Sequence, residues 1–524
     1  MNGGGGVTGV GAGGAPGSGG GNGGGAGDRA GNGPSDAHDA SPPDSSDAAV
    51  GGRPDAIVDA TAEARPRDLR PAAPIRDCPM PPEPPAGQAV QCPADVTELN
   101  RWLPNTPPVD SCRPPPHPAT ECRFYQFSWQ HFLIATTPDA TGRPAFLGWD
   151  SLSQVFGAAP RRLAAGELPL LEGGVTQAGG RQVLIDQKGH AIYYGMHMNA
   201  GFVNFVKQNG LTNSAGVRAA DPSLSFPPDV VELKEAWQVV PDTTPPTDFI
   251  TARVRVPTLA VDPTTHQITE DDTHPRDVTV ALLAIHVVFT LPGHPEFIWS
   301  TFEHVDARGI SDVAPNAPAN PEATAETVVP SMLTHALFKG GTTAAEANGG
   351  SLTPLLNPAT QLFLSSPTSI YRMYTASKSN QTDFDDDVVA MNENMTALFG
   401  RVKLPVTDRR GHYRLVGAIW QDRPDLSFET NRILVNDDND PDIKKNGGDS
   451  PRSITGGEDR LSSTAMESFT QPATSFPNCF SCHDTRAATA RGVPAARDQG
   501  SAVTLEPKQI NVSHIFNEVV RRGL

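Results

Sequence analysis

Close to the C-terminal end, the sequence carries Cys479-Phe-Ser-Cys482-His483, the C-x-x-C-H pattern. Two thiols three positions apart can form thioethers with the two vinyl groups on one edge of a haem, and the adjoining His483 can bring its imidazole onto the iron from the proximal side. From the chain's cysteine and histidine content, the pattern is expected by chance about 0.002 times. It therefore predicts one covalently attached haem c, with His483 as an axial ligand.

Zinc binding and dithiol redox chemistry are the alternatives at this position. A zinc site needs two more thiols or imidazoles at ligand spacing, and the chain has no second C-x-x-C pair. A thioredoxin-like dithiol follows a strand, and the sequence FPNCFSCHDTRA shows no strand pattern. Haem attachment is therefore favoured over a redox-active or structural dithiol.

The sixth ligand of the iron has several candidates. No methionine follows Met466, which excludes a later methionine as the distal ligand. His514 is the only histidine after the motif, and it lies nearly opposite the apolar face of a terminal helix, so it can cap that helix or ligate from its first turn. The other candidates are Met466, His286 and His304, and the sixth position can also stay open. His286, inside an apolar strand, is more typical of a hydrogen-bonded core histidine.

Net charge and hydropathy limit the partners. The net charge is -18 and the sequence pI is about 5.2. Such a charge repels the phosphate backbone, so nucleic acid is excluded as an expected partner. No window approaches 18 consecutive apolar residues, so we expect no integral membrane segment. The expected partner is an unidentified redox protein.

Four cysteines, separate from the haem motif, form an early cluster: Cys78, Cys92, Cys112 and Cys122. Their spacing contains no C-x-x-C pair, which argues against a zinc ribbon. The cluster is typical of two disulfides formed in an oxidising compartment, with buried thiols as the alternative.

Composition divides the chain into four parts. Residues 1–77, rich in Gly, Asp and Pro, cannot bury enough apolar surface to fold and predict a disordered tether. Residues 78–120 form a Pro/Cys-rich collar. Residues 121–470 form a sheet-rich α+β domain, and residues 471–524 form a haem segment packed on it, because too few residues follow the motif to enclose a macrocycle alone.

The residues after Met1 lack the basic and apolar regions of a signal peptide. Covalent haem attachment normally follows export. We therefore expect the true start to lie upstream of Met1, with a signal peptide or lipobox before the Gly tract. The expected location is the periplasm, or the cell envelope through a lipid tether.

Hydrophobic patterning predicts the fold class α+β: a large sheet-rich domain with peripheral helices and a short C-terminal haem-binding helical segment. A hairpin is expected around Pro292-Gly293. Strands are expected in 181–199 (two strands turning at 187–189), 231–240, 251–256, 278–291, 296–305 and 412–421. Helices are expected at 121–136, around 199–210, at 383–402 closed by Gly400, and at 511–524.

Two acidic groups offer weaker candidates for a cation site. Glu303, His304 and Asp306 are close in sequence, but strand alternation points Glu303 away from the other two, so a hydrogen-bonded strand end is favoured. The segment 438–442 places three aspartates at calcium-loop spacing, but Ile443 stands where the sharp turn requires glycine. A solvated acidic loop is favoured there.

The order of several segments along residues 120–524 resembles a family of large bacterial cytochrome c proteins with one C-terminal CxxCH motif. The segments are FSWQHFLIAT, LIDQKGHAIYYGMHMNAGFVNFVKQNGL, VELKEAWQVV, FIWSTFEHVD, YRLVGAIWQ, STAMESFTQ and NCFSCHDT followed by VSHIF. The resemblance implies an exported single-haem protein and electron transfer, without a substrate, and carries only Cys479, Cys482 and His483 as site residues.

Two functions from different classes follow. In the first, the chain is an electron carrier whose iron has a strong distal ligand. In the second, it is a peroxidase-like or oxidase-like haem enzyme with an open sixth position and a substrate pocket in the sheet domain. A tethered structural protein that uses haem to stabilise its fold is a third alternative.

Overall fold

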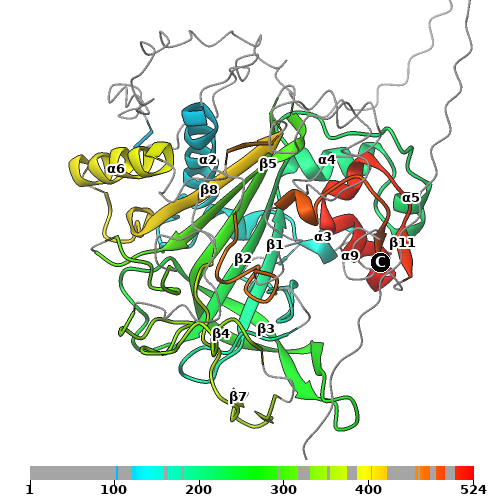
Figure 1. Cartoon of the computed structure of the whole chain (residues 1–524). Coiled ribbons are helices and arrows are strands. Elements are labelled where there is room, and N and C mark those ends of the chain that lie inside the picture. Colours follow the sequence, from blue (N-terminus) through cyan, green and yellow to red (C-terminus); the bar gives the residue numbers. More distant parts are fainter. Residues whose placement is uncertain are drawn as a thin grey trace, which may run out of the picture. The chain divides into compact units, whose positions relative to one another are not determined.

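A computed structural model of the chain describes a large antiparallel sheet with helices and turns around it (Figure 1). All the described residues belong to the unit formed by residues 71–524. They are 102–103, 121–157, 163–164, 166–178, 182–291, 294–307, 309–316, 331–350, 354–373, 386–402, 404–421, 455–457, 461–471, 479–489 and 502–524.

The main sheet has the strand order β1-β2-β4-β5-β8-β9, and β3 also pairs with β4. Every pairing between these strands is antiparallel. The strands are β1 (Ile192–Met198), β2 (Val231–Val240), β3 (Thr251–Val261), β4 (Ile268–Leu291), β5 (His294–His304), β8 (Tyr413–Gln421) and β9 (Thr455–Gly457). Two small sheets pair β6 (Leu356–Asn357) with β7 (Leu362–Phe363), and β10 (Ala488–Thr489) with β11 (Val503–Leu505).

Helices lie around this sheet in two groups (Figure 1). In the first group, α2 packs against β8 and α6; in the second, α4 packs against β1 and β2, and α5 packs against α9. The helices are α2 (Glu121–Ala135), α3 (Leu152–Val155), α4 (Ala200–Gln208), α5 (Ser214–Ala219), α6 (Asp386–Arg401) and α9 (His514–Arg522). Short 3-10 turns are η1 (Ala145–Gly148), η2 (Arg410–His412), η4 (Cys479–Ser481) and η5 (Gln509–Val512).

Alternation along the central strands gives the sheet two apolar faces. On β5, Ile298 belongs to the cluster that includes α2 and α6, while Trp299 belongs to the cluster that includes α4 and α9. On β8, Trp420 and Ile419 divide between the two clusters in the same way. Because both faces are covered, the central strands are apolar throughout, and the C-terminal segment has a preformed apolar surface on which to pack.

The chain is sheet-rich, as predicted, and its mixture of one large sheet with few helices is consistent with the α+β class. Strands form in all the expected regions except the first half of 181–199, where Ile185 and Ala191 make only an isolated bridge around the turn. The expected hairpin pairs β4 with β5, beginning at Leu291 and His294. The turn residues 292–293 themselves lie outside the described part.

Two boundaries differ from the prediction. Strand β4 begins at Ile268, ten residues before the apolar run, and pairs with β3 through an exposed turn closed by Asp262. Residues 268–277 are largely exposed and polar, so hydrophobic patterning gave no signal for them. Helix α6 includes Gly400 and ends at Arg401, so the expected closure at Gly400 is wrong.

Several expectations lie outside the described residues. These are the tether at 1–77, the acidic loop at 438–442 and the disulfides of Cys78, Cys92, Cys112 and Cys122; of these cysteines, Cys122 alone has a described backbone, in α2. Among the described helices, none is long and apolar enough to cross a bilayer.

Candidate haem-attachment site

The C-x-x-C-H residues form a tight turn at the start of the last described segment but one. Cys479 begins the 3-10 turn η4, and its carbonyl oxygen accepts hydrogen bonds from the backbone amides of Cys482 (3.1 Å) and His483 (2.9 Å). Residues at i and i+3 of such a turn lie one above the other, so both thiol groups are on one side. The two cysteine side chains are half-buried and are not joined in a disulfide.

His483 is held in place by Val512, a residue close to the C-terminal end of the chain. Its Nδ1 lies 2.9 Å from the carbonyl oxygen of Val512 and donates a hydrogen bond to it. This bond fixes the tautomer, because the proton on Nδ1 leaves Nε2 with its lone pair available. Burial, and then repulsion from His514, lowers the pKa of His483 well below its usual value, so the ring is neutral at neutral pH.

The sheet supplies the surface under this turn. The ring of Trp299 on β5 lies against His483, with centroids 3.9 Å apart and planes inclined by 40°. Phe480 is fully buried in the apolar cluster that also contains Trp299 and Phe516. The C-x-x-C-H turn therefore packs on the apolar surface of the sheet.

His514, at the first position of α9, also lies against His483. The two imidazole rings are stacked, with centroids 3.6 Å apart and an angle of 21° between their planes. His514 Nε2 lies 3.4 Å from the carbonyl oxygen of Cys482, and Ser513 caps the helix by accepting from the amide of Ile515. Burial lowers the pKa of His514 to about 4. The helix cap is therefore Ser513, and His514 is in the first turn.

The donor set fits a haem c. Two thiols on one side of a turn, a neighbouring neutral imidazole whose Nδ1 is engaged by a backbone carbonyl, and an apolar surface of Phe480 and Trp299 are the parts that attachment and proximal ligation require. The stack of His514 on His483 fits less well, because imidazoles on opposite sides of one metal approach it through nitrogen and not through their faces. His514 can serve as a distal ligand only after its ring turns out of the stack.

The other distal candidates lie elsewhere. Met466 is buried in a separate apolar cluster with Tyr194. Both ring nitrogens of His286 have partners, Thr301 Oγ1 at 2.8 Å and Glu467 Oε1 at 2.9 Å, as the core-histidine interpretation expects. His304 contacts Asp248 and Asp312. Of the four sequence-predicted residues, only His514 lies against His483.

Sequence reasoning missed three residues on the strands beneath the motif: Trp299, Lys234 and Glu232. Lys234 is half-buried, donates from Nζ to the carbonyl oxygen of Gln177 (2.9 Å), and has a pKa that desolvation lowers and that the charges of Glu467 and Cys482 raise. Glu232 accepts a hydrogen bond from Ser513 Oγ (2.5 Å), and burial raises its pKa to about 7. The sequence did carry a signal for two of them. Strand alternation places the charged residues Glu232 and Lys234 on the same side of an otherwise apolar strand.

The acidic group around β5 is divided, as alternation predicts. Glu303 forms a buried ion pair with Arg372, whereas His304 contacts Asp312. Asp306 lies in a turn, where its carboxylate accepts from the amide of Ile310. These three residues therefore do not form one site.

Comparisons of this chain with protein-family models, with curated proteins and with solved structures found no match. The functional argument therefore depends on the residues of the chain and their geometry.

Proposed function

We propose that this protein is an exported monohaem c-type cytochrome that transfers electrons, with the haem attached through Cys479 and Cys482 and ligated by His483. The observation that carries the proposal is the hydrogen bond from His483 Nδ1 to the carbonyl oxygen of Val512, in a C-x-x-C-H turn packed on an apolar sheet. Neither a structural dithiol nor a buried core histidine requires this combination.

The residues around the turn have separable roles in this proposal. The carbonyl of Val512 holds His483 in one tautomer, and Trp299 limits rotation of its ring. Buried Phe480 and Phe516 exclude water from one side of the turn, while the half-buried thiols keep an edge of the site near the surface. The haem, when bound, supplies one-electron exchange. A half-exposed edge suits exchange with a redox partner protein.

Covalent attachment is tested with the chain expressed in a host that has a cytochrome c maturation system and an export signal. The purified protein is expected to give a pyridine haemochrome spectrum for one haem per chain and to keep its pigment in acid acetone. Cys479→Ala and Cys482→Ala each remove one thioether, and the double variant is expected to lose all covalent pigment. A colourless matured wild-type protein, or pigment fully extracted by acid acetone, overturns the proposal.

One observation favours a second candidate, a haem enzyme with an open sixth position. His514 Nε2 points at the carbonyl oxygen of Cys482, with which it makes a long contact of 3.4 Å, and not toward a shared point with His483 Nε2. Cyanide and azide separate the two candidates. High-spin bands that respond to these ligands support the enzyme, whereas low-spin bands that ignore them support the carrier.

A further inference from the structure

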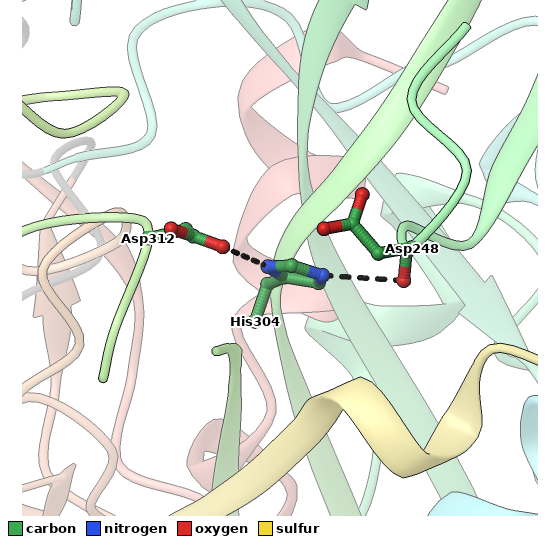
Figure 2. Close-up of side chains that lie close together, drawn as sticks. All are labelled: Asp248, His304 and Asp312. Carbon is green, nitrogen blue, oxygen red and sulfur yellow. Dashed lines mark hydrogen bonds and ion pairs between the residues drawn. The ribbon is translucent and has the colours of Figure 1, made fainter. Parts of the chain in front are cut away.

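A second group of ligand-type side chains lies at the far end of β5 from the haem-attachment site. His304 is the last residue of the strand, Asp312 belongs to the segment that follows, and Asp248 belongs to the loop between β2 and β3. Each offers one ligand atom, and the three atoms lie within 4.8 Å of one another. Figure 2 shows Asp312 facing one ring nitrogen of His304 and the main-chain oxygen of Asp248 facing the other.

The hydrogen bonding of His304 leaves one ring nitrogen directed at a carboxylate. Nε2 donates to the main-chain carbonyl oxygen of Asp248 (3.2 Å), which places the proton of the neutral ring on Nε2. Nδ1, in a side chain with no exposed surface, has no hydrogen-bond partner, although Asp312 Oδ2 is only 3.1 Å away. When Nδ1 carries no proton, it and the carboxylate oxygen are both acceptors, and a cation beside them would interact with both.

We propose that His304 Nδ1 and the carboxylates of Asp248 and Asp312 bind a divalent transition-metal ion of the Zn²⁺ or Mn²⁺ type. Imidazole and carboxylate ligands suit these ions. A ligating histidine characteristically donates its other ring N–H to a carbonyl or carboxylate, and Asp248 provides that carbonyl. Metal–ligand distances of about 2 Å require the ligand atoms to close by about 1 Å, which an aspartate side chain can do by a small rotation.

Charge and surroundings support a cation at this position. Within the described part of the chain, no lysine or arginine forms an ion pair with Asp248 or Asp312, so two carboxylates face one imidazole without a fixed positive charge. Phe249 stacks on His304 with ring centroids 3.4 Å apart, and Tyr413 meets it edge-on at 5.2 Å, so the nitrogen is held in an apolar setting. Asp312, with 37% of its side chain exposed, gives the ion a route from solvent.

This site is separate from the haem-attachment site. His304 is five residues beyond Trp299 on β5, which at about 3.3 Å per residue separates the two positions by roughly 16 Å. His304 also packs against Tyr413 of the apolar cluster that contains α2, whereas Trp299 belongs to the opposite face. The ion would tie the β2–β3 loop and the segment after β5 to the end of the sheet.

The test uses the full chain, treated with a chelator and then titrated with ZnCl2 or with MnCl2 by calorimetry, with zinc and manganese counted by elemental analysis. We expect one ion per chain and a rise in the thermal midpoint on binding. His304→Gln and Asp312→Asn are each expected to weaken binding by at least about 100-fold. Because Asp312 is partly exposed, Asp312→Asn carries the test if His304→Gln fails to fold.

The matched control is the surface pair His274 and Asp271, whose atoms are 2.8 Å apart with 82% and 46% of the side chains exposed. His274→Gln and Asp271→Asn should leave the stoichiometry, the affinity and the thermal shift unchanged. The proposal is overturned if the wild-type chain takes up no more ion than Asp312→Asn, or if the control variants lose the same affinity. In that case the 3.1 Å contact between His304 and Asp312 is an ordinary pairing of two side chains.

Discussion

His483 and His514 each contact a backbone carbonyl in the segment that carries the other histidine. His483 Nδ1 donates to the carbonyl oxygen of Val512, and His514 Nε2 approaches the carbonyl oxygen of Cys482, while the rings stack at 3.6 Å. The C-x-x-C-H turn and the start of α9 therefore position each other. A change in the ring of either histidine is transmitted to the backbone that holds the other.

His514→Ala tests whether His514 becomes the sixth ligand when haem is attached. In the electron-carrier proposal the matured wild type is low-spin, and removal of the imidazole stacked on His483 is expected to produce a high-spin spectrum and a new ability to bind cyanide. Visible absorption of both oxidation states, with and without cyanide, measures this.

Met466→Leu and His286→Gln are the controls for this prediction. Neither residue lies against His483, and His286 already has hydrogen bonds at both nitrogens, so their spectra should match the wild type. A His514→Ala protein that stays low-spin contradicts ligation by His514. A spectral change in Met466→Leu alone would instead assign the distal position to the methionine.

The sequence was sufficient for the parts of this site that are local in the chain. The spacing of Cys479, Cys482 and His483 predicts one turn with two thiols on the same side, and the structure contains that turn. Trp299 was not predictable, because a tryptophan in an apolar strand is most often a core residue, and only the tertiary fold brings it to His483. His304 was named with Glu303 and Asp306, which do not form one site with it, and its aspartate neighbours Asp248 and Asp312 come from other loops that the sequence does not place beside it.

The same contrast holds for the fold. Apolar runs predicted β2, β5 and β8 almost to their ends, because buried strands need apolar residues throughout. The polar beginning of β4 was missed, since its pairing with β3 is made by backbone hydrogen bonds on an exposed hairpin. Those bonds leave no pattern in the side chains.

Trp299→Ala is expected to destabilise the protein and loosen His483. The side chain is 4% exposed and packs on both the apolar cluster and the imidazole, so truncation leaves a cavity and lowers the free energy of unfolding by about 3–5 kcal/mol. Trp299→Phe keeps an aromatic ring and should lower the free energy of unfolding by less. Urea denaturation of both variants measures the difference; equal stability of Trp299→Ala and the wild type would contradict the packing role.

Removing one partner of the Glu303–Arg372 ion pair is expected to destabilise the fold. Both side chains are almost fully buried, and Glu303 also accepts from the amide and hydroxyl of Thr464, which ties the 461–471 segment to β5. Arg372→Met leaves a buried carboxylate without its partner and should lower the free energy of unfolding by about 3–5 kcal/mol.

The exposed pair Arg253 and Asp242 provides the comparison for Arg372→Met. Its side chains are 48% and 53% exposed, and Arg253→Met should lower the free energy of unfolding by less than about 1 kcal/mol, because water screens the charges. Thermal and urea unfolding of the two variants measure the contrast. If both variants lose a similar free energy of unfolding, burial does not determine how much the Glu303–Arg372 pair contributes to stability.

Glu232 is expected to make stability depend on pH. Burial raises its pKa from 4.5 to about 7, so the folded state binds more protons than the unfolded state between these values, and the free energy of unfolding falls as pH rises from about 4.5 to about 7. The full contribution is present below pH 4.5, is lost by about pH 7 to 8, and amounts to about 3 kcal/mol at most.

Glu232→Gln should be more stable than the wild type at pH 8 and lack this slope. Ser513→Ala removes both the helix cap and the hydrogen bond that lowers the pKa of Glu232, so it should lose about 1 kcal/mol and shift the slope to higher pH. Urea unfolding from pH 4 to 8 tests all three proteins, and an unchanged slope in Glu232→Gln would assign the pH dependence to another group.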